Sequence, residues 1–230
     1  MKRSEINDAI IRAEADFAKV GFALPGFAKW SLEDWKAQRA PARDMIETGL
    51  GWDVTDFAEG RFGTKGLLLF TVRNGKIAGG FGNRPYAEKI MIARRDQVTP
   101  MHRHGTKVED IINRAALTDG ATLAIRLYTA APDGSLSKSL PVVAHLDGMV
   151  RELAPGSVVK LNPGESITLF PTTYHSFWGE GGDVVAGEVS SVNDDRTDNI
   201  FAEPLARFSP IEEDAAVFRP IVTDIAGLSA

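Results

Sequence analysis

Hydrophobic positions near the start of the chain recur every three or four residues, the spacing of one face of an amphipathic helix. These positions are Ile6, Ile10, Ala13, Phe17 and Val20. We expect Ser4 to cap this helix. A turn at Pro25-Gly26 follows, and the sequence from Ser31 to Trp35 has a capping serine and early acidic residues, which predicts a second helix.

From about Gly51 the pattern changes to short aliphatic or β-branched runs separated by glycine, asparagine and proline. The clearest runs are residues 66–72, 88–93, 122–128 and 183–189. Turn signals at residues 73–76, 133–134 and 147–148 are those that β-hairpins require. Many short strands with regular turns predict a sandwich or barrel. We therefore expect a single domain, with an N-terminal helical extension over residues 1–50 and a β-barrel with a C-terminal tail over residues 51–230.

Composition narrows the possible partners. The 230 residues are 43% hydrophobic and 25% charged, as in ordinary globular proteins. A formal charge of −5 and no visible basic stripe disfavour binding to nucleic acid, so a small molecule is the expected partner. The N-terminus resembles neither a signal peptide nor a membrane span, and we expect a cytoplasmic protein. Cysteine is absent, so a bound metal would take nitrogen and oxygen ligands.

Three of the four histidines fit one metal-site pattern. His102 and His104 are two positions apart, so on a strand they face the same side. A turn at Gly105-Thr106 would let Glu109 begin another strand facing the same ion, and His175 follows a later strand and a proline bend. Unrelated surface or core histidines are the alternative interpretation. This ligand set favours manganese or iron(II), with zinc, nickel and cobalt possible. We expect His145 to be an ordinary histidine at a strand end.

These residues resemble the two cupin motifs: His-x-His followed by Glu109, and a second block from Asn162-Pro163-Gly164 to His175. The second block lacks the asparagine common after the cupin histidine. Two further segments are more specific, residues 99–112 and the run from Gly187 to Asn199. With the N-terminal helices, they resemble the D-lyxose isomerase family of cupin-type sugar isomerases. The chain departs from it mainly in a glycine-rich stretch at residues 78–82.

The resemblance implies a mainly β fold, a cupin double-stranded β-helix or jelly-roll barrel with N-terminal α-helices. It implies a metal-dependent aldose–ketose isomerase that interconverts D-lyxose and D-xylulose, with D-mannose and D-fructose as a second pair. It carries the metal ligands over as His102, His104, Glu109 and His175, usually with manganese. A homodimer is expected because cupin sheets leave edges to cover.

Aldose–ketose conversion by the enediol route needs a base that removes the C2 proton. Candidate carboxylates are Glu188, which shares strand parity with Val184 and Ala186, and Glu203 and Asp214 on a tail that could fold over the barrel mouth. Pairing with Arg196 or Arg207 is the alternative for Glu188. With the resemblance, Lys89 is expected to contact sugar oxygens as a catalytic and substrate-binding residue, although an exposed strand lysine is its alternative. Lys107 is a second candidate for substrate binding.

Three alternatives remain open at this level. A metal-assisted hydride shift would need no carboxylate base. A metal-dependent cupin oxygenase uses the same kind of ligand set, and a sugar-binding or regulatory cupin keeps the barrel without turnover. Ligand spacing alone does not choose among them, because one fold hosts many chemistries.

Overall fold

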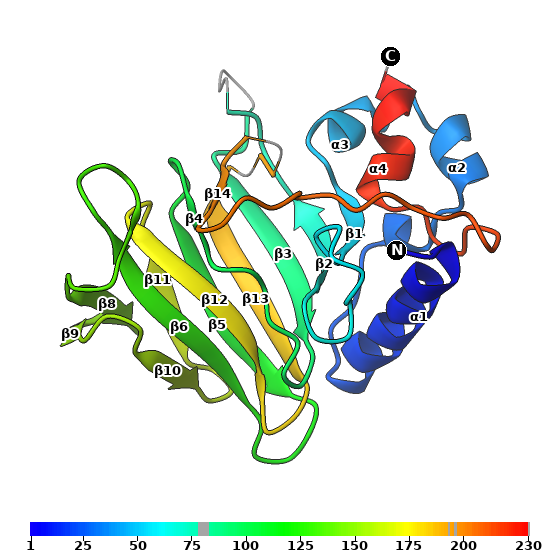
Figure 1. Cartoon of the computed structure of the whole chain (residues 1–230). Coiled ribbons are helices and arrows are strands. Elements are labelled where there is room, and N and C mark those ends of the chain that lie inside the picture. The colour runs from blue at the N-terminus through cyan, green and yellow to red at the C-terminus, as the bar shows by residue number, and fades with distance from the viewer. Residues whose placement is uncertain (78–82, 193, 196, 230) are drawn as a thin grey trace.

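The computed structural model describes residues 1–77, 83–192, 194–195 and 197–229. The glycine-rich stretch at residues 78–82 lies outside the described residues. Two curled antiparallel sheets face each other, and helices cover the outer face of the larger sheet at one of its ends (Figure 1). The prediction of a mainly β, cupin-like barrel with N-terminal helices is confirmed.

The helical elements lie at both ends of the chain. They are α1 (Arg3–Lys19), η1 (Gly26–Lys29), α2 (Leu32–Ala37), α3 (Arg43–Glu47), α4 (Val222–Ile225) and η2 (Ala226–Ser229). Ser31 and Asp34 form the predicted capping box of α2. The prediction that Ser4 caps α1 is wrong, because the helix begins at Arg3 and the side chain of Asp214 accepts hydrogen bonds from the Ser4 amide and hydroxyl. None of the described helices is both long and apolar enough to cross a membrane.

The larger sheet has the strand order β1-β2-β3-β13-β5-β11-β8-β9. Its strands are β1 (Gly51–Thr55), β2 (Leu67–Arg73), β3 (Tyr86–Ala93), β5 (Glu109–Ala116), β8 (Val142–Leu146), β9 (Met149–Leu153), β11 (Ser166–Leu169) and β13 (Val184–Ser191). The smaller sheet has the order β10-β6-β12-β4-β14, with β7 paired to β6. Its strands are β4 (His102–His104), β6 (Thr122–Ala130), β7 (Leu136–Ser137), β10 (Val158–Leu161), β12 (Thr173–Glu180) and β14 (Asn199–Phe201).

One hydrophobic core fills the barrel between the two sheets. It includes Leu69 and Met91 from the larger sheet and Leu123, Ile125 and Phe177 from the smaller one. Because a strand alternates its faces, the neighbours of these inward residues on β2 and β3 point outward. Most of the barrel interior is therefore lined with apolar side chains.

A second core joins the outer face of β1–β3 to the helices. Phe70, Ile90 and Ile92 pack there with the buried face of α1, whose members are Ile6, Ile10, Ala13 and Phe17. This part of the sheet is buried on both faces, which explains why residues 67–70 of β2 are all apolar rather than alternating with polar residues. The N-terminus and the C-terminal helices lie together on this side (Figure 1), and the tail is held by Arg3, which pairs with Glu213 and Asp224.

The helical layer contributes strongly to stability through Phe17. Its side chain is fully buried and its ring stacks on Trp52, with the centroids 6.2 Å apart. We expect Phe17→Ala to lower the free energy of unfolding by about 3–5 kcal/mol, the usual cost of deleting a buried aromatic ring. Ile11 on the same helix is 48% exposed, so Ile11→Ala should cost less than about 1 kcal/mol. Denaturant titration measures both values, and equal losses would contradict this packing.

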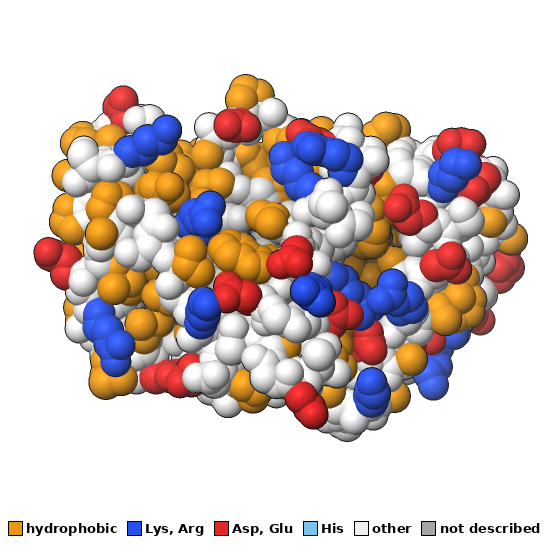
Figure 2. Space-filling view, turned by 60° about the horizontal axis from the view of Figure 1, so that its bottom comes forward, with side chains coloured by type: hydrophobic (Ala, Val, Ile, Leu, Met, Phe, Trp, Pro, Cys, Tyr) orange, Lys and Arg blue, Asp and Glu red, His pale blue; other side chains and the backbone are white. Residues whose placement is uncertain are grey.

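The surface mixes charges of both signs. Figure 2 shows hydrophobic side chains exposed in patches between Lys or Arg and Asp or Glu side chains, around a hollow near the middle of that face. On the face in view neither sign of charge forms a continuous strip.

Candidate metal centre and its pocket

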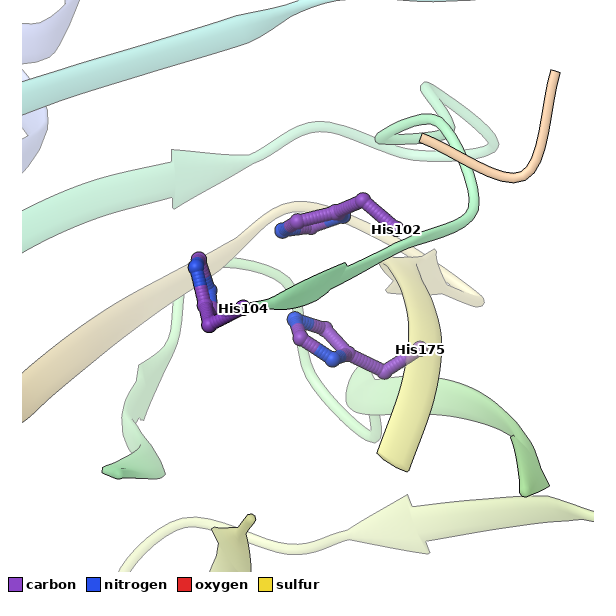
Figure 3. A group of neighbouring side chains, drawn as sticks. All are labelled: His102, His104 and His175. Carbon is purple, nitrogen blue, oxygen red and sulfur yellow. The ribbon is translucent and has the colours of Figure 1, made fainter. Parts of the chain in front are cut away.

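Backbone pairing brings the three predicted histidines together inside the barrel. His102 and His175 are direct partners where β4 pairs with β12, and His104 is two residues farther along β4. The three rings converge from these two strands (Figure 3), and one nitrogen from each lies within 4.8 Å of the others. The three histidines thus form a possible metal site.

Hydrogen bonds fix which nitrogen of two rings faces the site. The Nδ1 atoms of His102 and His175 lie 2.8 and 3.2 Å from the carbonyl oxygens of Pro100 and Thr173. A carbonyl oxygen only accepts, so each Nδ1 carries the hydrogen and each Nε2 is left with a free lone pair. Burial, with the neighbouring imidazoles of His175 and His104, holds the pKa of His102 well below its ordinary value. The ring is neutral at pH 7, as a metal ligand must be.

Glu109 completes this cluster from the opposite sheet. The predicted turn at Gly105-Thr106 carries the chain from β4 across to β5, which begins at Glu109. Its Oε1 atom lies 3.2 Å from Nε2 of His104 and 3.1 Å from Nε2 of His175. Oε1 is buried and has no aligned hydrogen-bond donor among the described residues. Ligands about 2.1 Å from one ion and at right angles are about 3 Å apart, so the donor atoms present fit a divalent cation.

A second carboxylate stabilises His104 from outside the cluster. Asp198 Oδ2 lies 3.0 Å from His104 Nδ1, although the ring N–H is not aligned on it, while Oδ1 accepts from the amides of Gly105 and Thr106. Burial opposes a proton on His104, but Glu109 and Asp198 outweigh burial and raise the pKa of the imidazole. Asp198 therefore places negative charge behind a ring that faces the cluster.

We expect Asp198→Asn to weaken binding of a divalent metal by about 10–100-fold, the usual effect of removing a group that orients a histidine ligand. Asp110→Asn is the matched control, because Asp110 neighbours Glu109 on β5 but accepts a hydrogen bond from Thr168 instead. Isothermal titration with Mn²⁺ measures both affinities. Equal affinities in the two variants would show that Asp198 does not act through His104.

Beside the histidines, buried carboxylates and cations alternate in one network. Lys107 Nζ lies 2.7 Å from Glu109 and 2.9 Å from Glu188. Lys89 Nζ lies 3.5 Å from both Glu188 and Asp195. Burial opposes the charge on Lys107, but Glu109, Glu188 and Asp195 outweigh it and raise the pKa of the ammonium group. Lys107 is therefore held as an ammonium group between Glu109 and Glu188, and Glu188 lies between the two lysine side chains.

The same pairing keeps Glu109 ionised. Its burial opposes the charge, but Lys107 and His104 outweigh burial and hold the pKa of the carboxyl well below its ordinary value. The carboxylate is available to a cation at neutral pH.

One pocket contains these groups. It is lined by the three histidines, Glu109, Lys107, Lys89 and Glu188. The apolar part of the lining is Leu67, Leu69, Met91, Ile111 and Phe177, together with Phe57 and Phe201. Lys89 and Glu188 reach it as direct cross-strand partners on β3 and β13. Lys89 is only 3% exposed, so its alternative as an exposed strand lysine is wrong. The structure brings these sequence-predicted residues into one pocket.

Two predicted candidates lie elsewhere. Glu203 is exposed beside a groove outside the barrel, and Asp214 is bonded to Ser4 at the start of α1. The structure brings neither carboxylate into the pocket. His145 lies on β8, with its ring 4.9 Å from that of Phe170, as expected for an ordinary strand histidine.

Four polar pocket residues were not among the predicted site residues: Thr99, Asp195, Asn199 and Arg207. Arg207 pairs with Asp53 and Asp195, not with Glu188, and Arg196 lies outside the described residues. For Asp195 and Asn199, the sequence signal that could have indicated a role in the site was the polar run that ends at Asn199. Arg207 follows in a tail without periodicity, so no pattern indicated that its side chain returns to the barrel.

Comparison with solved structures shows the class of fold. The L-ribose isomerase of Acinetobacter sp. DL28, solved as a mutant with L-ribose, matches 92% of this chain and 98% of its own with a TM-score of 0.58 and 14% identity. The L-ribose isomerase of Cellulomonas parahominis with L-ribose gives a TM-score of 0.55 at 15% identity, with the same coverage. The curled two-sheet barrel is thus the cupin-like fold of sugar isomerases.

Sequence comparison identifies the family. The model of the D-lyxose isomerase family matches residues 1–225. The D-lyxose/D-mannose isomerases of Serratia proteamaculans and Escherichia coli O157:H7 are 48% and 45% identical, each over 93% of both chains. The chain belongs to the D-lyxose isomerase family and is an aldose–ketose isomerase.

Proposed function

We propose that this enzyme interconverts D-lyxose and D-xylulose, and D-mannose and D-fructose, with a divalent metal. The observation that carries the proposal is one buried pocket that contains three converging imidazoles and Glu109 together with Glu188 and Lys89. The names of the two bacterial relatives support the choice of sugars. Monosaccharides carry no charge, which agrees with a pocket whose ionic groups pair with one another.

His102, His104, Glu109 and His175 would hold the metal. Their nitrogen and oxygen atoms suit manganese best, and iron(II), cobalt, nickel and zinc bind the same kinds of ligand. A divalent cation held there supplies Lewis acidity to adjacent sugar oxygens and neutralises negative charge as it develops. Glu109 takes part with Oε1, since Oε2 is already paired with Lys107.

Glu188 is the proposed base of the enediol route. It removes the proton from C2 of the aldose, and the same carboxyl group returns a proton to C1, so the ketose differs from the aldose only in the position of hydrogens. Lys107 and the hydroxyl of Ser190 both donate to Oε1 at 2.9 Å. These contacts hold the carboxylate in one orientation, while Oε2 faces Lys89 at the longer distance of 3.5 Å.

Two lysines serve the sugar oxygens in this proposal. Lys89 is the proposed donor to a sugar hydroxyl or carbonyl oxygen during the proton transfer between O2 and O1. Lys107 stays protonated between its carboxylates and contributes positive charge rather than basicity. The apolar wall of Leu69, Met91 and Phe177 excludes water from the same side, which strengthens these electrostatic contacts.

An anaerobic assay tests the proposed function. Metal-loaded protein incubated with D-lyxose or D-mannose without oxygen should form D-xylulose or D-fructose, and a chelator should stop the reaction. A cupin oxygenase would consume oxygen and form no ketose, while a sugar-binding cupin would return the sugar unchanged. Either of these results would overturn the proposal.

We also propose a homodimer that covers a sheet edge. Strand β9 is the terminal strand of the larger sheet, and Val143, Met149 and Val150 on β8 and β9 are 52–63% exposed. Exposed apolar edges favour pairing with another chain. We expect Val150→Lys to shift the mass measured by light scattering from dimer to monomer, with Ile11→Lys on α1 as a control. A monomeric wild type would refute this. The cytoplasmic location stays a prediction.

A further inference from the structure

A groove with a cavity of about 460 Å³ lies on the outer face of the smaller sheet, outside the barrel. Its floor is formed by alternate, outward-facing residues of two paired strands, Arg126 and Tyr128 on β6 and Ser176 and Trp178 on β12. Residues from 98–101, 136–138 and 201–205 form its rim. A cavity of this size holds a small organic molecule.

Three cations, Lys65, Arg126 and Lys138, and one carboxylate, Glu203, line the groove, and none of the three cations is paired with Glu203. Arg126 and Lys138 are both exposed, and in the described part of the chain neither has a carboxylate oxygen within 4.0 Å. Other lysines nearby are paired: Lys65 lies 3.2 Å from Glu59, and Lys160 on β10 binds Glu180. Two free cations over one cavity favour an anionic ligand, and phosphate oxygens form charge-assisted bonds with both side-chain types.

The remaining lining is aromatic and aliphatic. Trp178 and Tyr128 are half-buried in the floor, and the Arg126 guanidinium carbon lies 5.6 Å from the centroid of the Trp178 ring. Met101, Leu136 and Leu205 add apolar surface at the rim. A bare inorganic anion would leave this surface uncovered, whereas a ring attached to a phosphate would cover it.

The groove shares a wall with the metal pocket. Phe201 lines both cavities, and its ring centroid lies 5.9 Å from that of His102. Pro100 also lines the groove, and its carbonyl oxygen accepts the hydrogen bond from His102 Nδ1. An occupant of the groove therefore touches two residues that position one imidazole of the site.

We propose that this groove is a regulatory site for a small phosphate monoester with a ring or apolar body, and that occupancy changes the affinity of the metal pocket for its sugar. The phosphate binds Arg126 and Lys138, and the organic part stacks on Trp178. A nucleotide and a sugar phosphate share this chemistry. Binding itself does not depend on the proposed reaction, so the two proposals fail separately.

Isothermal titration of the metal-loaded protein with AMP, D-fructose 6-phosphate and inorganic phosphate tests the site and separates the sources. One organic phosphate should bind about tenfold or more tightly than inorganic phosphate. Arg126→Ala and Lys138→Ala should each weaken it by about tenfold or more, the loss of one charge-assisted contact. Lys160→Ala is the matched control, because Lys160 belongs to the same sheet but pairs with Glu180, and it should bind normally.

Kinetics test the coupling. The bound phosphate should change KM for the aldose by about fivefold or more in the wild type and in Lys160→Ala. It should not change KM in Arg126→Ala, and the rate of that variant without phosphate should be normal. Equal binding of all three probes, or binding unaffected by both groove variants, would overturn the proposal. So would an unchanged KM at saturating phosphate, or groove variants that alter the oligomeric mass, since the latter would make this face a subunit interface.

Discussion

His102→Ala and His175→Ala should each abolish stoichiometric metal binding and lower kcat/KM for D-lyxose by about 10³-fold or more. The reason is that the two imidazoles are cross-strand partners whose Nδ1 atoms are held by backbone carbonyl oxygens, which leaves both Nε2 atoms for the metal. Lewis-acid stabilisation is worth several kcal/mol, and about 1.4 kcal/mol corresponds to a factor of ten in rate. Metal analysis of the dialysed variants and initial rates of ketose formation measure the two effects together.

His145→Ala is the matched control for these variants. It removes the remaining histidine, which packs against Phe170 on the outer side of the larger sheet, so metal content and rate should equal those of the wild type. A His102→Ala variant that kept both full metal content and full activity would show that the metal site lies elsewhere.

Glu188→Gln should lower kcat by about 10²–10⁴-fold, the usual contribution of a positioned general base, while leaving metal content unchanged. The glutamine side chain keeps the shape of glutamate but lacks the carboxylate that is the proposed base for the C2 proton. Its Oε1 atom still accepts from Lys107 and Ser190, so the fold should survive. Rates, metal analysis and thermal unfolding of the variant separate a lost base from a damaged pocket.

Glu203→Gln and Asp214→Asn complete that comparison. Both carboxylates lie outside the pocket, one beside the outer groove and one at Ser4, so both variants should retain normal kcat. Full activity in all three variants would refute Glu188 as the base and favour the hydride shift.

Much of the fold could be predicted because burial leaves a periodic pattern. The apolar spacing of α1 and the alternation or continuity of the strands follow from which faces are covered. Helices α3 and α4 have only five and four residues, which is too short for a periodic signal and stable only through tertiary packing. Tertiary contacts also explain why the prediction of Ser4 as a helix cap was wrong. The acceptor for the Ser4 amide is Asp214, which is 210 residues away in the sequence.

The candidate site also has a part that local sequence pattern predicts and a part that depends on tertiary contacts. His102, His104 and Glu109 are close in sequence, so strand parity predicts how the two histidines face and the turn at Gly105-Thr106 predicts the return of Glu109. Lys89 and Glu188 were candidates one at a time, but only the β3–β13 register shows that they are opposite each other. Asp195 and Arg207 reach the pocket from the two sides of β14 in sequence, and Arg207 pairs with both Asp53 and Asp195. No local pattern encodes these contacts.

The most direct test of the central claim is the conversion of D-lyxose in D₂O by the metal-loaded enzyme, followed by NMR of the D-xylulose formed. Proton transfer through Glu188 predicts solvent deuterium that accumulates at C1 of the ketose over many rounds of interconversion, because the carboxyl proton exchanges with solvent in a fraction of turnovers. It also predicts no conversion after chelation and recovery when Mn²⁺ is restored. Ketose that stays free of deuterium at C1 after the reaction has run long past equilibrium would contradict the carboxylate mechanism, and the absence of D-xylulose would contradict the proposed function itself.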